Sequence, residues 1–409
     1  MINKKFFLNI IWSMGSHILS RGVLLLSGML LARNLAVEDF AMYNFFMMTS
    51  MTIMNYSSMG LEVAASRFFA EKKENQNNII LGNLYSIAII LAILSSVLTF
   101  IFIDKIWDTT TFYKTLITIT VLFLVINIVP TGAIMGIEKY KDLFFLSILN
   151  SLIILSGAFL TISMNEISIQ IYTYIFSVIF SIFIQTHIVK NNTFLFTELS
   201  NFKLRGKAIK EIMSFCGVMS IVSILAATAP WLIGKIIIDT FNVLHFSVYS
   251  IGLQWFALAM FIPGMVSRVI LPRLVKEYKK GIESKKEIRI TLLFTLSIAF
   301  IIFILGFLFS PYLTNWYGDE YLAYSNVISF FFFLAIVYAP INVLANIIIV
   351  KMNTKVWFLI TLMWFISLLV LLFPMMEFYG FWGVLYAQGL SALIYNLLSL
   401  FTCIKKGYL

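Results

Sequence analysis

The chain consists of long apolar runs separated by short polar segments. Each run is close to the roughly twenty residues that an α-helix needs to cross the hydrocarbon core of a membrane. The first half contains runs at 10–32, 40–64, 79–103, 115–137, 143–163 and 167–189. The second half contains runs at 212–234, 246–271, 288–309, 324–350, 356–374 and 381–403. We therefore predict an all-α protein with about twelve membrane-spanning helices.

One of these runs occurs twice. Residues 40–73 align without a gap with residues 246–279, an offset (246 − 40 = 206) close to half of the 409-residue chain. Both copies share a Phe-x-x-Tyr start and an Arg-x-x-x-Glu-x-Lys end. Internal repeats at half-length are common among secondary transporters. The repeat predicts two pseudo-symmetric six-helix bundles.

A basic segment at 194–211 separates the two predicted bundles, which span residues 1–193 and 212–409. It carries four basic residues, Lys203, Arg205, Lys207 and Lys210. We predict a cytoplasmic surface linker, which could form an amphipathic helix on an anionic leaflet.

Composition excludes a soluble protein. Hydrophobic residues make up 61% of the chain, charged residues only 12%, and the mean hydropathy is +0.95. Soluble domains are about half apolar and about a quarter charged. The net charge of +10 is explained by basic cytoplasmic loops rather than by nucleic acid binding. Cys216 and Cys403 both lie in apolar runs, so neither a disulfide framework nor a metal cluster is expected.

Loop charges predict the orientation. Alternate loops, counted from the N-terminus, contain 23 of the 29 Lys and Arg residues. The remaining loops contain only Arg33, Lys105 and Lys114 among basic residues, together with several acidic ones. By the positive-inside rule, both termini should be cytoplasmic. The loops on the other side are too short to form a domain.

Four charged residues remain inside the predicted spans: Arg21, Glu62, Lys235 and Arg268. Such residues cost about 2.5–3.5 kcal/mol each on insertion scales and usually have a function. Their net charge of +2 favours a phosphate or diphosphate headgroup as ligand, which arginine can bind through two parallel donors. We predict Arg21, Lys235 and Arg268 as diphosphate-binding residues.

Each of these assignments has a structural alternative. Arg21 could bond carbonyl groups of a neighbouring helix, and Lys235 could extend to the membrane interface. His17, four residues before Arg21, could carry protons or be an ordinary core histidine. Glu62 and Arg268 occupy equivalent repeat positions with opposite charge. They could form a gate or ion-coupling pair, or each could extend to the cytoplasmic interface.

The sequence also lacks several motifs. It has no phosphate-binding loop of an ATP-driven pump, no metal-ligand spacing and no nucleophile elbow, so we expect no cofactor, no metal and no enzymatic activity. Polar residues inside the spans could line a hydrated path or bond helices together. They are Asn127, Gln185, Gln254, Asn342 and Gln388.

LLARNLAVEDFAMYNF (30–45) resembles the signature of Wzx-type polysaccharide repeat-unit flippases of the multidrug/oligosaccharidyl-lipid/polysaccharide exporter superfamily, although Ala36 and Ala41 replace its usual glycines. Met59-Gly60-Leu61 with Arg67, and VILPRLVKEY (269–278), resemble the ends of the second and eighth helices. Ser20-Arg21-Gly22 is similar to a serine-arginine pair in the first helix of the related lipid II flippase.

The resemblance implies two bundles that form a V around a basic cavity. It implies a flippase that moves undecaprenyl-diphosphate-linked oligosaccharide repeat units across the bacterial cytoplasmic (inner) membrane for O-antigen or capsule assembly. Ion-coupled alternating access is suspected in the superfamily. The implied partners are the lipid-linked substrate, membrane lipids, a polysaccharide polymerase and a chain-length regulator, with no nucleic acid.

Three other functions remain open at this point. A multidrug exporter of the same fold is one, although the positive charge inside the spans disfavours its mostly cationic substrates. A membrane polysaccharide polymerase or lipid-linked glycosyltransferase is another, but the short external loops offer no room for an acceptor domain. A scaffold for assembly enzymes is the third, and it would leave the intramembrane charges without a role.

Overall fold

The fold comes from a computed structural model, which describes residues 4–58, 60–70, 77–105, 107, 110–192, 206–266, 285–352 and 354–408. These residues form helices and short connections, with no β-strand among them. Ten of the helices are long and apolar enough to cross a membrane. The chain is therefore a multi-pass, all-α membrane protein, as predicted.

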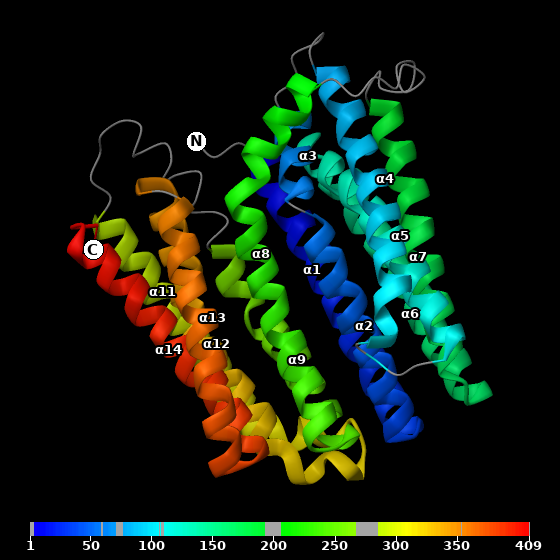
Figure 1. The fold of residues 1–409 in the computed structure, drawn as a ribbon, viewed down its shortest axis with the longest axis vertical. Helices are drawn as coiled ribbons and strands as arrows, with labels where there is room; N and C mark the ends of the chain where they lie inside the picture. The colour runs from blue at the N-terminus through cyan, green and yellow to red at the C-terminus, as the bar shows by residue number, and fades with distance from the viewer. Residues whose placement is uncertain are drawn as a thin grey trace. The chain divides into compact units, whose positions relative to one another are not determined.

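Each predicted run has a helix in the described part of the chain (Figure 1). The first half forms α1 (Lys4–Asn34), α2 (Val37–Ser58), α3 (Leu61–Ala70), α4 (Asn77–Phe102), α5 (Thr111–Gly136), α6 (Tyr140–Met164) and α7 (Ile167–Asn192). The second half forms α8 (Gly206–Thr240), α9 (Val243–Ala259), α11 (Lys285–Asn315), α12 (Ser325–Lys351), α13 (Thr354–Tyr379) and α14 (Phe381–Lys405). Two 3-10 helices, η1 (Ile103–Lys105) and η3 (Asp319–Tyr324), lie in connections.

The chain divides into two compact units. The first contains 1–27 and 42–227, and the second contains 28–41 and 228–409. This division differs from the boundary predicted at 194–211. The end of α1 and the start of α2 pack with the second half, where the Phe40 ring lies 6.3 Å from the Tyr321 ring. Helix α8 begins inside the predicted linker, at Gly206, and residues 193–205 lie outside the described part.

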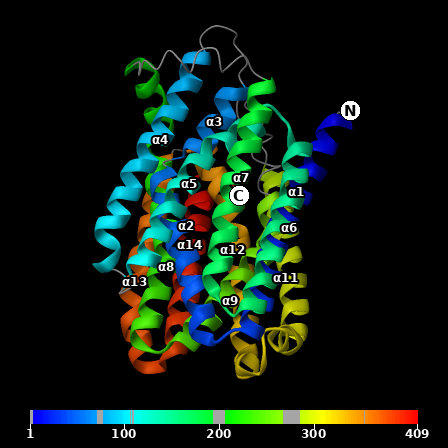
Figure 2. The same ribbon diagram turned by 90° about the vertical axis from the view of Figure 1, so that its right-hand side faces the viewer.

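The fourth span of each half forms the centre of its unit. About 61% of the apolar stretch of α5 and 72% of that of α12 is buried, the largest fractions among the candidate spans. Helix α5 contacts α3, α4 and α7, and α12 contacts α9, α11, α13 and α14. In the first unit α7 lies between α5 and α6 (Figure 2). The equivalent positions of α5 and α12 support the predicted pseudo-symmetry.

The repeat is confirmed at the level of helix boundaries. Helices α2 and α9 begin at Val37 and Val243 (243 − 37 = 206), and α1 and α8 end at Asn34 and Thr240 (240 − 34 = 206). The repeated run is interrupted in both copies, which the hydropathy pattern does not predict. In the first copy Gly60 adopts a φ of 75° between α2 and α3, a conformation that favours glycine.

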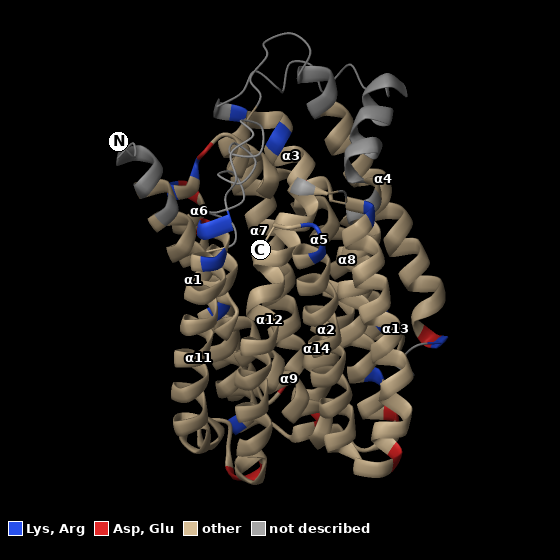
Figure 3. Ribbon diagram, turned by 90° about the vertical axis from the view of Figure 1, so that its left-hand side faces the viewer, with Lys and Arg blue, Asp and Glu red and all other residues tan. Residues whose placement is uncertain are grey.

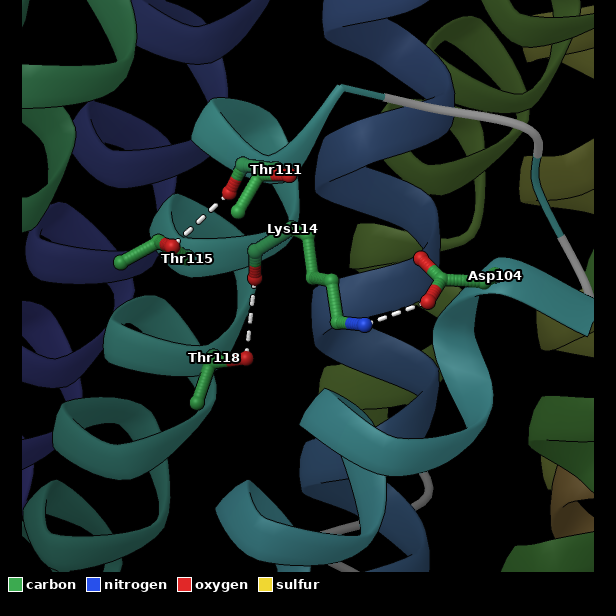
Figure 4. Close-up of polar contacts among 5 residues, drawn as sticks. All are labelled: Asp104, Thr111, Lys114, Thr115 and Thr118. Carbon is green, nitrogen blue, oxygen red and sulfur yellow. Dashed lines mark hydrogen bonds and ion pairs between the residues drawn. The ribbon is translucent and has the colours of Figure 1, made fainter.

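Charged residues lie mostly toward the ends of the helices (Figure 3). One ion pair closes the connection between α4 and α5, where the Lys114 ammonium binds the Asp104 carboxylate (Figure 4). The same ammonium lies 4.5 Å from the centre of the Phe100 ring. Thr118 donates a hydrogen bond to the Lys114 carbonyl oxygen at 2.9 Å. The ion pair therefore joins η1 to the first turn of α5.

Candidate functional site

Arg21 lies near the middle of α1. It follows the start of the candidate span Ile11–Asn34 by ten residues and precedes its end by thirteen, which puts it roughly 15 and 20 Å from the two ends. Its side chain is exposed, and no carboxylate among the described residues forms an ion pair with it. The Arg21 charge interacts electrostatically with the Tyr174 hydroxyl of α7.

Small residues on α1 orient Arg21 away from α6. Ser16 Oγ lies 2.5 Å from Ser147 Oγ of α6, and Ser20 Oγ donates a hydrogen bond to Ser147 Oγ at 3.4 Å. A Cβ atom at Gly15 would lie 2.6 Å from the Phe144 ring, so this face of α1 packs closely on α6. Arg21 follows Ser20 by one residue and is therefore rotated by about 100° from the α6 contact.

His17 lies one turn before Arg21 on the same face of α1. Its side chain is half-buried. Like Arg21, it directly follows one of the serines on the α6-facing side, so both residues project beside that contact.

The first unit also contains an aromatic and methionine-rich cluster. Its buried centre consists of Leu124 from α5 with Tyr174 and Val178 from α7. Five partly buried side chains pack against this centre: Met47, Met51, Met54, Phe123 and Ile182. Tyr174 in this cluster carries the hydroxyl with which the Arg21 charge interacts electrostatically.

Lys235 is paired in the second unit. Its ammonium binds both carboxylate oxygens of Asp239, four residues later on α8. The side chain of Lys235 is 25% exposed and that of Asp239 is 51% exposed. Asp239 lies outside the predicted span 212–234 and was therefore not counted among the charges inside the spans. The Asp239 carboxylate reduces the positive charge that Lys235 can offer a ligand.

Glu62 lies in the first turn of α3, immediately after the break at Gly60. A carboxylate there interacts favourably with the positive end of the helix dipole. Its side chain is exposed. Arg268, its proposed gate partner, lies outside the described residues, so the pairing stays a prediction.

Among the polar residues predicted inside the spans, Gln185 has a described hydrogen bond between two helices. Thr131 of α5 donates a hydrogen bond to Gln185 Oε1 of α7 at 3.0 Å. Asn150 of α6 donates to Ser181 of α7 at 2.7 Å. Buried Gln185 therefore holds α5 to α7. Within the described ranges, no three His, Cys, Asp or Glu residues are grouped as metal ligands would be.

Residues 6–244, more than half of the chain, match the family described as polysaccharide biosynthesis protein. The chain belongs to this family. A comparison with curated proteins by sequence gave no match.

The fold of this polysaccharide biosynthesis protein is shared with solved transporters and flippases. An inward-facing MATE-family multidrug resistance transporter of the MOP superfamily matches with a TM-score of 0.78 and 14% identity, over 94% of this chain and 93% of that one. The lipid II flippase MurJ in an inward closed conformation matches at 0.76 and 18% identity, over 97% and 87%. A MOP superfamily transporter from Pyrococcus furiosus matches at 0.74 and 13% identity, over 97% and 94%. Family and fold together support a membrane transporter or flippase.

Two features of this family member were missed by sequence reasoning. The Lys235–Asp239 pair has the i, i+4 spacing of a helix ion pair and was therefore detectable. The electrostatic interaction between Arg21 and Tyr174 was not detectable, because the two residues lie in helices far apart in the sequence.

Proposed function

We propose that this protein moves undecaprenyl-diphosphate-linked oligosaccharide repeat units from the cytoplasmic to the periplasmic leaflet by ion-coupled alternating access. The product would be used for O-antigen or capsular polysaccharide assembly. Family membership supports the pathway. The single observation that carries the substrate class is the exposed Arg21 guanidinium in the middle of a membrane span.

Arg21 binds the diphosphate in this proposal. A guanidinium presents donors in a planar fork that matches two phosphate oxygens, and it stays charged at any physiological pH. Its interaction with a diphosphate is stronger inside a membrane protein than in water, because the local dielectric constant is lower. Arg21 would thereby give the diphosphate of the lipid-linked oligosaccharide a fixed contact within the membrane.

The other predicted residues have supporting roles. Lys235 and Arg268 add positive charge for the diphosphate, and Glu62 with Arg268 forms a gate. Glu62 and His17 are the proposed ion-coupling groups, since each can exchange a proton. If Glu62 and Arg268 form a gate, reversing either charge alone should abolish transport, and reversing both charges together should restore it. A double variant as inactive as the single ones would contradict it.

The protein is proposed to lie in the bacterial inner membrane with both termini in the cytoplasm. The excess of Lys and Arg in alternate loops supports this orientation. Its partners are the lipid-linked substrate and membrane lipids, together with the polymerase and chain-length regulator that would act on the delivered repeat units.

The decisive experiment follows a fluorescent undecaprenyl-diphosphate oligosaccharide in proteoliposomes. Reconstituted protein should make the probe accessible to a reagent on the opposite face, and Arg21→Ala should abolish this at equal protein content. Equal rates for wild type and empty vesicles would contradict the proposal.

A multidrug exporter is the second candidate, because MATE transporters share the fold. The same proteoliposomes should be tested with a cationic dye. Uptake of the dye without movement of the lipid probe would favour this candidate.

A further inference from the structure

An open groove lies between α5 and α7 on the surface of the first unit. Its volume is about 460 Å³, which is within the range of about 300–1,000 Å³ that holds small ligands. Phe183 is 71% exposed, so the groove is open to the surface at this residue. Its walls are formed by Phe123, Ile126, Ile179, Ile182, Phe183, Thr186, His187 and Lys190.

The α7 wall changes from apolar to basic along the helix axis. The lining residues of α7 recur every three or four positions, so they occupy one face of the helix. Ile179, Ile182 and Phe183 come first, and Thr186, His187 and Lys190 follow. Ile179 and Lys190 are eleven residues apart, or about 16 Å along the axis. A membrane lipid has the same order of groups, an apolar chain followed by a charged head.

Two of the wall residues are anchored to the interior of the first unit. Phe123 and Ile182 pack against the buried cluster of Leu124, Tyr174 and Val178. Thr131 and Gln185 bond α5 to α7 beside the polar end. The groove therefore has fixed apolar walls rather than being a gap between independent helices.

We infer that this groove binds the isoprenoid chain of the transported lipid, with His187 and Lys190 beside its phosphate groups. The inference rests on the proposed function. The groove lies between only two helices and has a single apolar strip, which suits a lipid with a single chain better than a phospholipid with two. Basic residues between transmembrane helices bind lipid phosphate headgroups by charge attraction. Lys190 also belongs to a loop set predicted to be cytoplasmic, the side from which the substrate enters.

A binding experiment on the full-length protein in detergent tests this inference. The probe is a long-chain isoprenyl diphosphate without sugar, and the readout is its apparent Kd. Ile179→Trp fills the apolar part, and Lys190→Gln removes the charge. Matched controls are Leu152→Trp, at a 59% exposed position on α6, and Lys141→Gln, at an exposed basic position at the start of α6.

We expect Ile179→Trp and Lys190→Gln each to weaken binding by about tenfold, or about 1.4 kcal/mol, while both controls bind as wild type. A photoreactive residue at Phe183 should cross-link the probe. Binding unchanged in all four variants would overturn the inference. Equal competition by phosphatidylglycerol would overturn it too, since the groove would then hold any anionic lipid.

The test separates this inference from the proposed function. Normal probe binding by the groove variants, combined with loss of lipid movement in Arg21→Ala, would refute the groove and leave the flippase intact. Groove-dependent binding without any lipid movement would refute the flippase and leave the groove intact.

Discussion

Gly132 of α5 lies against the backbone carbonyl oxygen of Glu62 in α3. A Cβ atom at position 132 would be 2.3 Å from that oxygen and 2.9 Å from Ala65 Cβ. One turn later, a Cβ atom at Gly136 would be 2.5 Å from the Ser66 carbonyl oxygen. Small residues four positions apart let two membrane helices approach closely. The two glycines therefore determine where α3, and with it Glu62, packs on α5.

Gly132→Val should destabilise the protein by displacing α3. The obstructing atoms belong to the backbone, so no side-chain rotation can relieve the overlap, and overpacking of this kind costs about 1–3 kcal/mol. We expect a lower midpoint of thermal unfolding in detergent. Gly82→Val is the matched control, because a Cβ atom there meets nothing within 4 Å. If Gly132→Val is as stable as Gly82→Val, this contact does not hold α3.

This contact illustrates what the sequence can and cannot predict. The number and order of the spans were predictable, because apolar length alone determines which segments cross a membrane. The repeat also predicted that α2 and α9 begin at equivalent residues. The packing of α3 on α5 was not predictable, because the Gly132-x-x-x-Gly136 spacing identifies a close-contact face without identifying its partner.

Arg21→Ala should lower transport of the proposed lipid substrate without lowering stability. Its side chain is exposed, so truncation leaves no buried group unpaired. Loss of a charged hydrogen bond costs about 1.5–3 kcal/mol, or roughly ten- to a hundredfold in affinity. Transport in proteoliposomes and thermal unfolding should be measured on the same preparation.

Arg21→Lys distinguishes charge from geometry. Lysine retains the charge but not the planar fork, so partial activity is expected. A fall in unfolding temperature in Arg21→Ala, with normal transport by the folded fraction, would support the structural alternative in which Arg21 bonds a neighbouring helix.

The Thr131–Gln185 hydrogen bond should contribute to stability rather than to transport. Gln185→Leu removes the acceptor and Thr131→Val removes the donor. Interhelical hydrogen bonds of this kind contribute about 0.6 kcal/mol on average and up to about 2 kcal/mol. A double-mutant cycle on unfolding free energy should show coupling of that size. Additive effects, together with transport lost in Gln185→Leu, would instead place Gln185 on a hydrated path.

The candidate site was only partly predictable for a similar reason. Arg21, Glu62 and Lys235 were identified because charges inside apolar runs are rare and their positions can be read from the sequence. Their surroundings depend on tertiary contacts. Arg21 interacts electrostatically with Tyr174 only because the fold places α1 and α7 in the same unit. Asp239 binds the Lys235 ammonium one helical turn away and so changes the role expected of Lys235.

Asp239→Asn tests whether Lys235 contributes to diphosphate binding. The carboxylate now binds the ammonium and competes with any anionic ligand for it. If Lys235 binds the diphosphate, removing the competitor should tighten binding of an isoprenyl diphosphate, and Lys235→Gln should weaken it. The double variant Lys235→Gln/Asp239→Asn should then behave like Lys235→Gln. Because the pair is partly exposed, its own contribution to stability should stay below about 1 kcal/mol. Unchanged binding in all three variants would show that the pair has only a structural role at the end of α8. Among the described residues, Arg21 would then be the remaining predicted diphosphate ligand.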